Sequence, residues 1–506
     1  INAEYGEMKN AFQAAEYERA KVVVTFFDED AVFTNTLHPA GSLFEFPVST
    51  EAAAIQHENY RKALQSFGCT VFNAADVLRS ASREKLLVLA AEALQFQLVT
   101  APNAKSEHFL SEQYKQTTLA PMSQKELVKI VLTRPTVYLE AQNRNTFICM
   151  RSVEYHPLGN CVFTRDQQIT TRKGIVMNNF AANQRKEEIK IMRFVFEELG
   201  YNVIGQMPQN ATIEGGDFVV VDSNTAALGV GLRSSYSAGQ YLMSHDLLGF
   251  DRFVIVKDTF DQNQDRMHLD CTFSPLHHKL VLLDEEICKP GKQRFVDEYT
   301  KQDTGYVMTR ANVEFQEWLG SEGFSIVRLP HEYQLKYGCN MLNLGFQGDH
   351  FRALTVHEPS KLFIEQDKTF LTYCQTNNVK IEFSYVPFDK ITAMYGSLHC
   401  ASQVVERENK FDCPFQHKEV CIDKFDYFVY LPTFYDEDET LFARVMQKCE
   451  ELVAQGKKLY YINKYFIDTP KSPQKSEGGI QKMVEHLKEV EKIELQNCFI
   501  EIGKNE

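Results

Sequence analysis

Hydrophobic and polar positions along the chain follow a strand-like pattern in some stretches and a helix-like pattern in others, and these two kinds of stretch recur in a regular order. Short β-branched and aromatic runs predict strands, and apolar residues three and four apart predict helices. From about residue 159 the order strand, strand, helix, strand recurs. The predicted elements are strands 161–164 and 174–177, helix 187–199 and strand 201–204; strands 217–222 and 225–231, helix 239–248 and strand 252–256; strands 268–273 and 280–283, helix 312–319 and strand 324–329; strands 340–344 and 353–356, helix 360–372 and strand 380–383. Repetition of one ββαβ-like unit predicts an α/β repeat architecture closed in a ring.

The two ends of the chain fit less regularly into this repeat. The N-terminal part predicts a strand at 21–27 and a helix at 49–67, which Ser49 or Thr50 caps and Gly68 ends. Further helices are expected near 83–97 and at 124–132, the latter capped by Ser123. A charged stretch at 406–412 marks a change in composition. Beyond it we expect strands at 427–431, 458–462 and 498–502, helices at 436–454 and 480–490, and a loop at 469–479. We therefore predict a main domain over 1–405 and a small C-terminal α/β extension over 406–506, in which no catalytic group of residues is apparent.

Composition narrows the class of protein. The chain has 506 residues, more than a single domain usually holds, and its formal net charge is −14. An acidic chain is poorly suited to nucleic acid or an anionic membrane, so neither is expected as a partner. It suits a cationic small substrate, although surface acidity is also what solubility requires.

Cysteine usage and apolar runs bear on location. The 12 cysteines form no CxxC pair, which argues against a zinc ribbon and a disulfide scaffold and favours a reducing compartment. No apolar run reaches the ~20 residues that span a bilayer. We expect a cytoplasmic protein. Because the sequence begins at Ile1, an organellar address such as the mitochondrion stays open.

The stretch Thr212–Phe218 reads TIEGGDF and stands directly before an apolar run. Its two glycines allow a sharp bend or the close approach of a ligand. An acidic side chain, Glu214 or Asp217, is thus presented at the start of a strand. Taken alone, this pattern is equally that of a plain turn.

Three further stretches place chemically active residues in similar settings. His268 and Asp270 are two apart on a predicted strand, so they share one face, where the carboxylate can orient the imidazole and raise its pKa. Asp166 ends another predicted strand, and Cys400 lies in a loop beside His399. Each has a structural alternative, in which His268 and Asp270 form a solvated polar face, Asp166 forms a salt bridge, and Cys400 is a small buried apolar side chain. Together, a thiol, a His–Asp pair and further carboxylates are what hydrolysis of a planar, cationic guanidinium requires.

Several motifs in one order resemble those of the arginine deiminase family, in the guanidino-group-modifying (amidinotransferase) superfamily. The resemblance covers roughly residues 21–405. The motifs are FTRDQ at 163–167, NQRKEE at 183–188, IEGGD at 213–217, GVGLRSS at 229–235, MHLDCTF at 267–273, GSLHC at 396–400 and, more loosely, HPAGSLFEF at 38–46. The fold that this resemblance implies is a five-bladed α/β propeller of pseudo-fivefold ββαβ units.

The resemblance also implies roles for individual residues. The catalytic residues would be the nucleophile Cys400, the general acid and base His268, and the carboxylates Glu214 and Asp270. Asp166 and Asp270 would bind the guanidinium, and Arg233 and Arg185 the carboxylate of the amino acid. The remaining substrate contacts would be Leu43 and Phe163, with Asp217 supporting the turn.

The implied reaction converts L-arginine and water to L-citrulline and ammonia through a covalent thiouronium on the cysteine, with no metal or cofactor. A homo-oligomer is expected, as is common in the family. An amidinotransferase and an ornithine-forming arginine dihydrolase would use the same residues. Agmatine and methylated arginine are alternative substrates, since the SLHC sequence at 397–400 also resembles hydrolases of those compounds. A silent propeller that serves as a scaffold is the non-enzymatic alternative.

Overall fold

The computed structural model describes residues 9–408, apart from 104, 143–146, 261 and 348–349, and short stretches beyond. Those stretches are 427–431, 444–445, 447–448, 451–452, 454–455, 457, 459–463 and 499–501. The chain divides into two compact units, Ile1–Glu408 and Asn409–Glu506. No helix among the described residues is long and apolar enough to cross a membrane.

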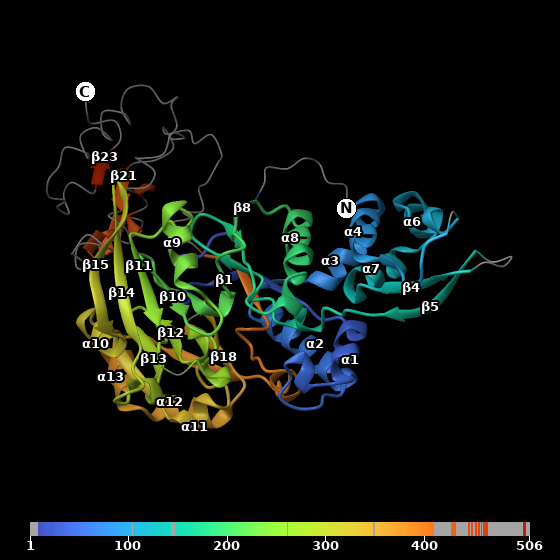
Figure 1. Cartoon of the computed structure of the whole chain (residues 1–506). Helices are drawn as coiled ribbons and strands as arrows, with labels where there is room; N and C mark the ends of the chain where they lie inside the picture. Colours follow the sequence, from blue (N-terminus) through green and yellow to red (C-terminus); the bar gives the residue numbers. More distant parts are fainter. Residues whose placement is uncertain are drawn as a thin grey trace. The chain divides into compact units, whose positions relative to one another are not determined.

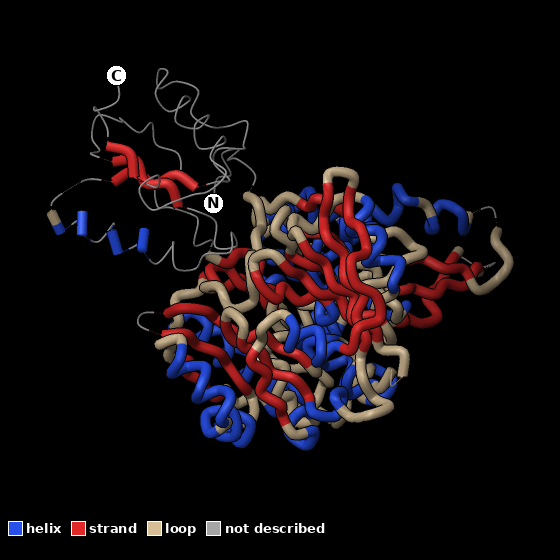
Figure 2. Tube along the Cα trace, turned by 90° about the vertical axis from the view of Figure 1, so that its left-hand side faces the viewer, coloured by secondary structure: helices blue, strands red, loops and turns tan. Residues whose placement is uncertain are grey.

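In the described part of the first unit, five sheets share one topology. Strands and helices alternate throughout this part of the chain (Figures 1 and 2). In each of the five sheets, a central strand pairs antiparallel with one neighbour and parallel with a strand that follows it in the chain, and helices stand between these two parallel strands in sequence. The sheet within residues 95–154 differs, because its parallel strand precedes the central one. The strands of the five sheets are β20 (Gln403–Arg407), β1 (Ala20–Thr25) and β2 (Thr70–Asn73); β6 (Gln168–Thr170), β7 (Ile175–Met177) and β8 (Val203–Gln206); β9 (Phe218–Asp222), β10 (Thr225–Val230) and β11 (Arg252–Lys257); β12 (Phe273–His277), β13 (Leu280–Asp284) and β16 (Ser325–Leu329); β17 (Leu342–Gln347), β18 (His350–Thr355) and β19 (Ile381–Tyr385). The predicted ββαβ repeat is therefore present, and the chain is α/β.

The helices that connect the parallel strands mostly begin and end where their sequence signals stand. The connecting helices are α1 (Glu29–Thr36), α2 (Thr50–Ser66), α8 (Glu188–Glu198), α9 (Tyr236–Ser244), α10 (Phe315–Ser321), α12 (Glu358–Gln366) and α13 (Lys368–Thr376). The Ser49 side chain accepts from the Ala52 amide at the start of α2, and Gly68 follows that helix with φ of 82°. The Asp367 side chain caps α13 and separates it from α12, so the single helix expected at 360–372 is two helices.

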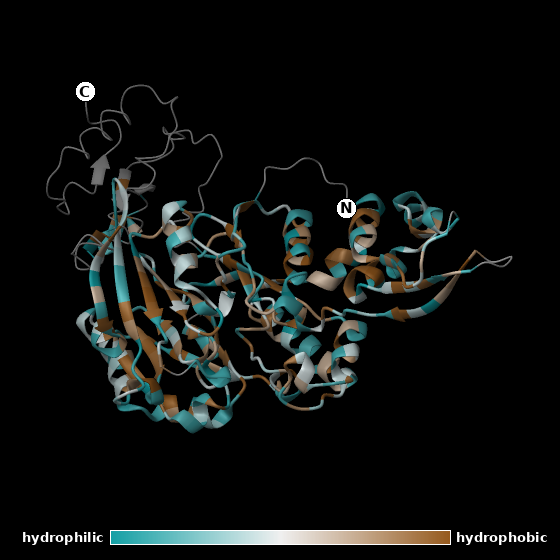
Figure 3. Cartoon of the chain, viewed as in Figure 1, coloured by the Kyte–Doolittle hydropathy of each residue, from teal (hydrophilic) through white to brown (hydrophobic). Residues whose placement is uncertain are grey.

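One sheet is buried on both faces, which explains its continuous apolar sequence. Side chains on one face of this sheet, such as Val220 and Ile255, pack with Leu242 of α9. Side chains on the other face, such as Val219 and Val254, pack with Phe273 of β12 and Trp318 of α10. The hydrophobic residues follow these strands in Figure 3. This layer holds the start of β9 rigidly in place, directly after the TIEGGDF stretch.

Two additions extend the repeat. The hairpin of β14 (Phe295–Gln302) and β15 (Gly305–Glu314) widens the β9–β11 sheet, since β14 pairs antiparallel with β11. An insertion between β2 and β6 has its own sheet and helices and carries a projecting hairpin, β4–β5 (Figure 1). Its elements are α3 (Ala74–Ser80), α4 (Arg83–Ala93), β3 (Gln95–Leu98), α5 (Ser106–Leu110), α6 (Glu112–Leu119), α7 (Gln124–Thr133), β4 (Thr136–Ala141) and β5 (Ile148–Glu154). Ser123 caps α7 in a capping box with Glu126, as the sequence predicts.

Several other local predictions are wrong. The helix expected near 83–97 ends at Ala93, and Gln95–Leu98 form the strand β3. The expected strand 161–164 is instead the 3₁₀ turn η2 (Gly159–Val162) followed by an irregular stretch, and the expected strand 268–273 opens with the 3₁₀ turn η6 (Leu269–Cys271). The helix expected at 312–319 begins only at Phe315, because the preceding residues belong to β15. The sequence shows apolar content at these places, but not the tertiary contacts that bend the backbone.

In the second unit the structure describes three strands, β21 (Tyr427–Leu431), β22 (Leu459–Asn463) and β23 (Phe499–Glu501). β21 pairs parallel with β22 and antiparallel with β23. The strands expected in the extension are thus confirmed. Most of the expected helix 436–454, and all of 469–479 and 480–490, lie outside the described residues.

Candidate active site

The TIEGGDF stretch forms a tight turn that packs against two other parts of the site. Glu214 is extended, and Gly215–Asp217 form the 3₁₀ turn η4 before β9. A Cβ atom on Gly215 would lie 1.9 Å from the Arg165 carbonyl oxygen, and one on Gly216 would lie 2.6 Å from Nδ1 of His268. Both glycines are therefore required by close approach. The room that they leave is occupied by the protein itself, by the FTRD backbone and the His268 ring.

His268 is a buried imidazole between two carboxylates. Its Nε2 lies 2.9 Å from Oε2 of Glu214, and its Nδ1 lies 3.9 Å from Oδ1 of Asp166. Burial lowers the pKa of His268, but the charges of Asp166, Glu214 and Asp217 outweigh burial and raise it to about 10. At neutral pH the imidazole is protonated and can donate a proton.

Asp166 belongs to a buried chain of charges. Its Oδ2 accepts a hydrogen bond of 2.8 Å from Nη1 of Arg185. Arg185 also donates to Glu188, at 2.9 Å from Nη2 to Oε2, and its guanidinium lies 4.4 Å from the ring centroid of Phe180. Burial alone would raise the pKa of Asp166, yet His268 and Arg185 lower it below its usual value. Asp166 is therefore an ionised carboxylate, and Arg185 is engaged on two sides.

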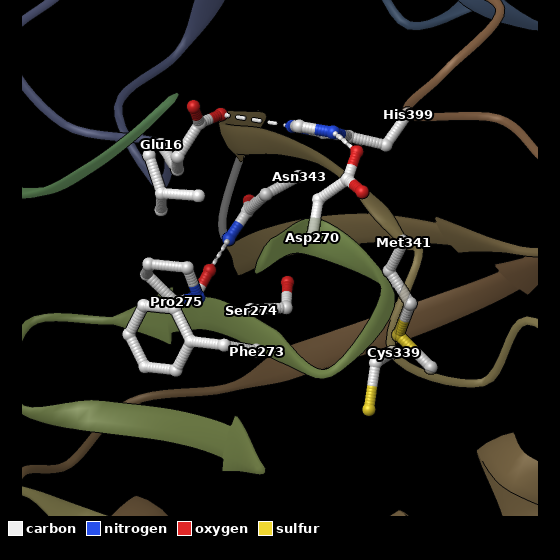
Figure 4. Close-up of a pocket in the computed structure, with 10 residues that line it drawn as sticks. Glu16, Asp270, Phe273, Ser274, Pro275, Cys339, Met341, Asn343 and His399 are labelled. Atoms are coloured by element: carbon white, nitrogen blue, oxygen red, sulfur yellow. Dashed lines mark hydrogen bonds and ion pairs between the residues drawn. The ribbon is translucent and has the colours of Figure 1, made fainter. Parts of the chain in front are cut away.

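Asp270 is fixed from behind by an imidazole. Nδ1 of His399 lies 2.8 Å from Oδ2 of Asp270, and Nε2 of His399 lies 3.6 Å from Oε2 of Glu16 (Figure 4). Glu16 in turn accepts a hydrogen bond of 3.0 Å from Nη2 of Arg407. Burial disfavours the charge of Glu16, but the nearby His399 imidazole and the charge of Arg407 hold its pKa well below the usual value. This buried network links the loop that carries Cys400 to the first residues of the described chain.

Cys400 lies beside Asp270. Its Sγ is 3.9 Å from Oδ2 of Asp270 and 3.4 Å from Oδ1 of Asn340, which also accepts from the Cys400 amide. The backbone of Arg165 pins the same loop, because its amide donates to the Cys400 carbonyl at 3.0 Å. Burial, followed by the charges of Asp270 and Asp166, raises the pKa of the thiol well above 9. A cation bound among these carboxylates would lower that pKa again.

A pocket of about 230 Å³ leads to the thiol. Cys400, Cys271 and Asn340 line it together with charged residues farther out, among them Glu45 and Lys336. His268 and the carboxylates Asp166, Glu214 and Asp270 are not among its lining residues. The pocket therefore reaches Cys400 from one side. The charges of Asp270 and Asp166 act on the thiol as well.

Two buried carboxylate oxygens, Oδ1 of Asp166 and Oε1 of Glu214, have no hydrogen-bond partner among the described residues. A planar cation with several N–H groups would satisfy both. Asp166, Glu214 and His268 are also the group of described residues whose geometry could hold a metal ion, with ligand atoms within 4.8 Å of one another. The raised pKa of His268 keeps a proton on its imidazole, and a protonated imidazole does not ligate metals well.

The remaining predicted residues lie around this centre. Phe163 is buried, and its ring occupies the space where a side chain on Gly396 would be. Leu43 is partly buried, with a left-handed backbone (φ 65°). Arg233 lies with Nη1 3.9 Å from Oε1 of Glu214 and donates at 3.0 Å to Gln264. Whether these residues contact a substrate stays a prediction.

Sequence reasoning did not find four residues that hold the site together. They are Glu16, Arg165, Asn340 and, as the partner of Arg185, Glu188. Asn340 belongs to the stretch GCNMLNLG at 338–345, which resembles a structural strand of the family and is therefore interpreted from sequence as packing. Glu188 stands in the matched NQRKEE motif, and its spacing of three from Arg185 on a helix start was an available signal. Glu16 lies outside the quoted motifs and has no signal of its own.

His268 and Asp270 were expected on one face of a strand, and that expectation is wrong. The turn η6 separates them, so His268 contacts Glu214 whereas Asp270 contacts His399. Asp217 was expected to support its turn. Its carboxylate accepts a hydrogen bond of 2.6 Å from Oγ of Ser234 and one of 2.9 Å from the Leu269 amide. Burial raises the pKa of Asp217 to about 7.

Comparison with known proteins identifies relatives of this chain. The arginine deiminase of Halobacterium salinarum is 26% identical over 232 residues, which cover 34% of this chain and 47% of that protein. The arginine deiminase of Levilactobacillus brevis is 32% identical over 147 residues, covering 27% of this chain and 33% of that protein. The matched region thus spans about half or less of these relatives.

Solved structures give a weaker likeness. The N-terminal domain of ArgZ, a cyanobacterial arginine dihydrolase, is 13% identical and covers 76% of this chain and 97% of its own, with a TM-score of 0.41. A dimethylarginine hydrolase (DDAH) from Pseudomonas aeruginosa, in complex with citrulline, is 12% identical over 77% of this chain and all of its own, also with a TM-score of 0.41. The family described as arginine deiminase, by contrast, matches residues 41–407, which is most of the sequence. This chain belongs to the arginine deiminase family.

Proposed function

We propose that the chain hydrolyses the guanidino group of L-arginine to give L-citrulline and ammonia. The observation that carries this proposal is the pair of buried carboxylate oxygens on Asp166 and Glu214 that accept no hydrogen bond from the described residues, in a site that also holds a thiol and a protonated imidazole. A guanidinium supplies the missing donors. It also brings the positive charge that makes a thiolate accessible at Cys400, whose proton is lost to solvent when the substrate binds.

The first half-reaction forms a covalent intermediate. The Cys400 thiolate attacks the central guanidinium carbon and forms a C–S bond. The C–N bond to one terminal nitrogen breaks, and protonated His268 gives its proton to the departing nitrogen, which leaves as ammonia. The product is a cationic thiouronium on Cys400, which the neighbouring carboxylates stabilise.

The second half-reaction restores the enzyme. Neutral His268 takes a proton from water, and the resulting hydroxide adds to the same carbon. Collapse of the adduct breaks the C–S bond, returns the thiolate, and releases the hydroxyl proton as citrulline forms. That proton is taken up by the ammonia released in the first half-reaction, which becomes ammonium. Glu214, bonded to His268 at 2.9 Å, favours the protonated imidazole that begins the next cycle.

Arg185 takes a different part in this account from the one the family resemblance implies. Because it is paired with both Asp166 and Glu188, it orients the Asp166 carboxylate toward the guanidinium. Asp270 is oriented in the same way by His399. Two carboxylates held from behind define the plane in which a guanidinium is bound.

The larger organisation belongs to the same proposal. The five sheets of common topology are the blades of a five-bladed propeller, and pairing of β20 with β1 joins the end of the first unit to its beginning. Residues 1–405 form the catalytic domain, and 406–506 form a C-terminal α/β extension. A homo-oligomer is expected in solution.

Substitution of Cys400 by Ala tests the proposal. Cys400→Ala should abolish citrulline formation and retain arginine binding, since the carboxylates remain. Cys69→Ala is the matched control: Cys69 is also buried, and its Sγ donates to the Ala20 carbonyl, far in sequence from the site motifs. Citrulline formation by folded Cys400→Ala at the wild-type rate would refute the nucleophile and with it the mechanism.

A further inference from the structure

A second thiol lies close to the thiol of Cys400, and the proposed reaction does not use it. Cys271 follows Asp270 directly, at the end of the turn η6. Its side chain lines the pocket of about 230 Å³ that leads to Cys400. Among the cysteines that the structure describes, Cys271 and Cys400 are the two that line this pocket, and both are free thiols. A small solute that enters the pocket therefore meets two thiols.

One carboxylate holds both of these thiols. The Sγ of Cys271 lies 3.6 Å from Oδ1 of Asp270, and the Sγ of Cys400 lies 3.9 Å from Oδ2 of the same side chain. Burial and the charge of Asp270 raise the pKa of the Cys271 thiol, and the charge of Cys400 raises it further. Each sulfur atom thus lies within the electrostatic reach of the other.

The two backbone segments that carry the thiols are tied together by one amide side chain. Oδ1 of Asn340 accepts a hydrogen bond of 3.4 Å from the Cys400 amide. Nδ2 of Asn340 lies 3.5 Å from the carbonyl oxygen of Asp270, the residue before Cys271. A single buried side chain therefore spans the distance between the two segments, so Cys271 and Cys400 are neighbours in space although 129 positions separate Asp270 from His399 in the sequence.

We propose that Cys271 and Cys400 form a site of reversible oxidation, in which a peroxide oxidises Cys400 and Cys271 then closes a disulfide with it. In the first step the sulfur of Cys400 attacks one oxygen of hydrogen peroxide. The S–O bond forms, the O–O bond breaks, water leaves, and Cys400 becomes a sulfenic acid. In the second step the sulfur of Cys271 attacks the sulfur of Cys400. The S–S bond forms, the S–O bond breaks, and the hydroxyl leaves as water with the proton of Cys271.

The reaction balances without a further reagent. The two thiols together give up two electrons and two protons, and one peroxide becomes two water molecules. To form the bond, the sulfur atoms must approach to about 2.05 Å, so the contacts of both with Asp270 are lost. The disulfide therefore blocks the thiol of Cys400 and disturbs the carboxylate beside it.

The value of such a pair lies in its reversibility. A thiol reductant reopens a disulfide, whereas a sulfenic acid without a neighbouring thiol is oxidised further to a sulfinic acid, which reductants of this kind do not restore. Cys271 would thus protect Cys400 from permanent loss. Because burial and the charge of Asp270 raise the pKa of both thiols, the oxidation is slow at neutral pH and is favoured by alkaline conditions.

Peroxide treatment of the full chain tests this inference. Wild type and Cys271→Ser are exposed to hydrogen peroxide without substrate, and citrulline formation is measured before and after dithiothreitol, relative to an untreated sample of the same variant. Wild type should lose activity and regain most of it. Cys271→Ser should lose activity and regain at least about tenfold less, because its oxidised Cys400 has no partner thiol.

Cys288→Ser is the matched control. The Sγ of Cys288 also contacts an aspartate residue, since it donates to the Asp284 carbonyl at 3.5 Å, but Cys288 does not line the pocket. This variant should behave like wild type through oxidation and recovery.

Peptide mapping under non-reducing conditions detects the bond itself and needs no turnover of arginine. In treated wild type and Cys288→Ser, the peptides that contain Cys271 and Cys400 should appear as one linked pair that has lost two hydrogen atoms. Absence of this pair would overturn the inference, and so would equal recovery of wild type and Cys271→Ser. If the linked chain still forms citrulline, the oxidation site stands and the nucleophile of the proposed function is wrong. If Cys271→Ser does not fold, the linked pair in wild type decides alone.

Discussion

Replacing Gly216 by Ala is a sharp test of the role given to His268. The added Cβ would lie 2.6 Å from Nδ1, 2.8 Å from Cγ and 3.1 Å from Cβ of the imidazole. Ordinary contacts of such atoms begin near 3.5 Å, so the ring must retreat by about 1 Å. Its other side is fixed by the 2.9 Å bond to Glu214, which that movement would stretch or rotate.

A displacement of about 1 Å in a catalytic group costs roughly 100-fold in rate, or about 2.7 kcal/mol of activation free energy. We therefore expect kcat for arginine deimination to fall by about 100-fold in Gly216→Ala, with overpacking costing about 1–3 kcal/mol of unfolding free energy. Gly216 has no positive φ, so the backbone accepts Ala there.

Gly320→Ala is the matched control, because a Cβ there meets nothing within 4 Å and Gly320 lies in helix α10, where Ala is favoured. Steady-state citrulline formation and circular dichroism of both variants decide the matter. If Gly216→Ala folds and its kcat stays within about twofold of wild type, the claim that the position of the His268 ring sets the rate of the reaction is refuted.

Two further predictions concern protonation. The pKa of His268 is raised from 6.5 to about 10, so its proton stabilises the fold fully below about pH 6.5, and that contribution is lost as pH rises toward 10. The free energy of unfolding of the wild type, measured with denaturant, should therefore fall more steeply with rising pH over this range than that of His268→Gln. The difference in slope is at most about 1.4 kcal/mol per pH unit, and equal slopes would contradict the raised pKa. Because burial and the charges of Asp270 and Asp166 raise the pKa of the Cys400 thiol, iodoacetamide should alkylate it slowly at pH 7, whereas a cationic haloacetamidine should react at least about tenfold faster by supplying the missing cation. Intact-mass kinetics measures both rates, and equal rates that Asp166→Asn leaves unchanged would count against a guanidinium site.

Much of the site could be predicted from sequence because its chemistry is carried by short motifs. Cys400, Asp166 and Glu214 stand in three separate motifs, and His268 and Asp270 share a fourth. Hydrogen bonds or ion-pair distances link these residues in two groups, Asp166–His268–Glu214 and Asp270–Cys400. What the motifs could not give is the support behind each carboxylate. A pairing across the length of the chain, such as Glu16 with His399, leaves no local pattern.

The fold was predictable to a similar extent. Hydrophobic periodicity identified the ββαβ units, since each buries its strands in the same way. The prediction from hydrophobic periodicity failed at the turns η2 and η6. At η6 a polar contact, the hydrogen bond from the Leu269 amide to Asp217, bends an apolar stretch, and hydrophobic periodicity does not reveal such a contact. The hairpin β14–β15 was missed because its second strand is largely exposed and carries no alternating pattern.

One measurement tests the central claim most directly. Incubate the chain with L-arginine and quantify citrulline, ornithine and ammonia in the same samples, with Cys400→Ala alongside. The account predicts equal amounts of citrulline and ammonia, no ornithine, and no products from the variant. Ornithine with two ammonia per arginine, or turnover that needs an added amine such as glycine, would contradict deimination, and no consumption of arginine would contradict an enzymatic role.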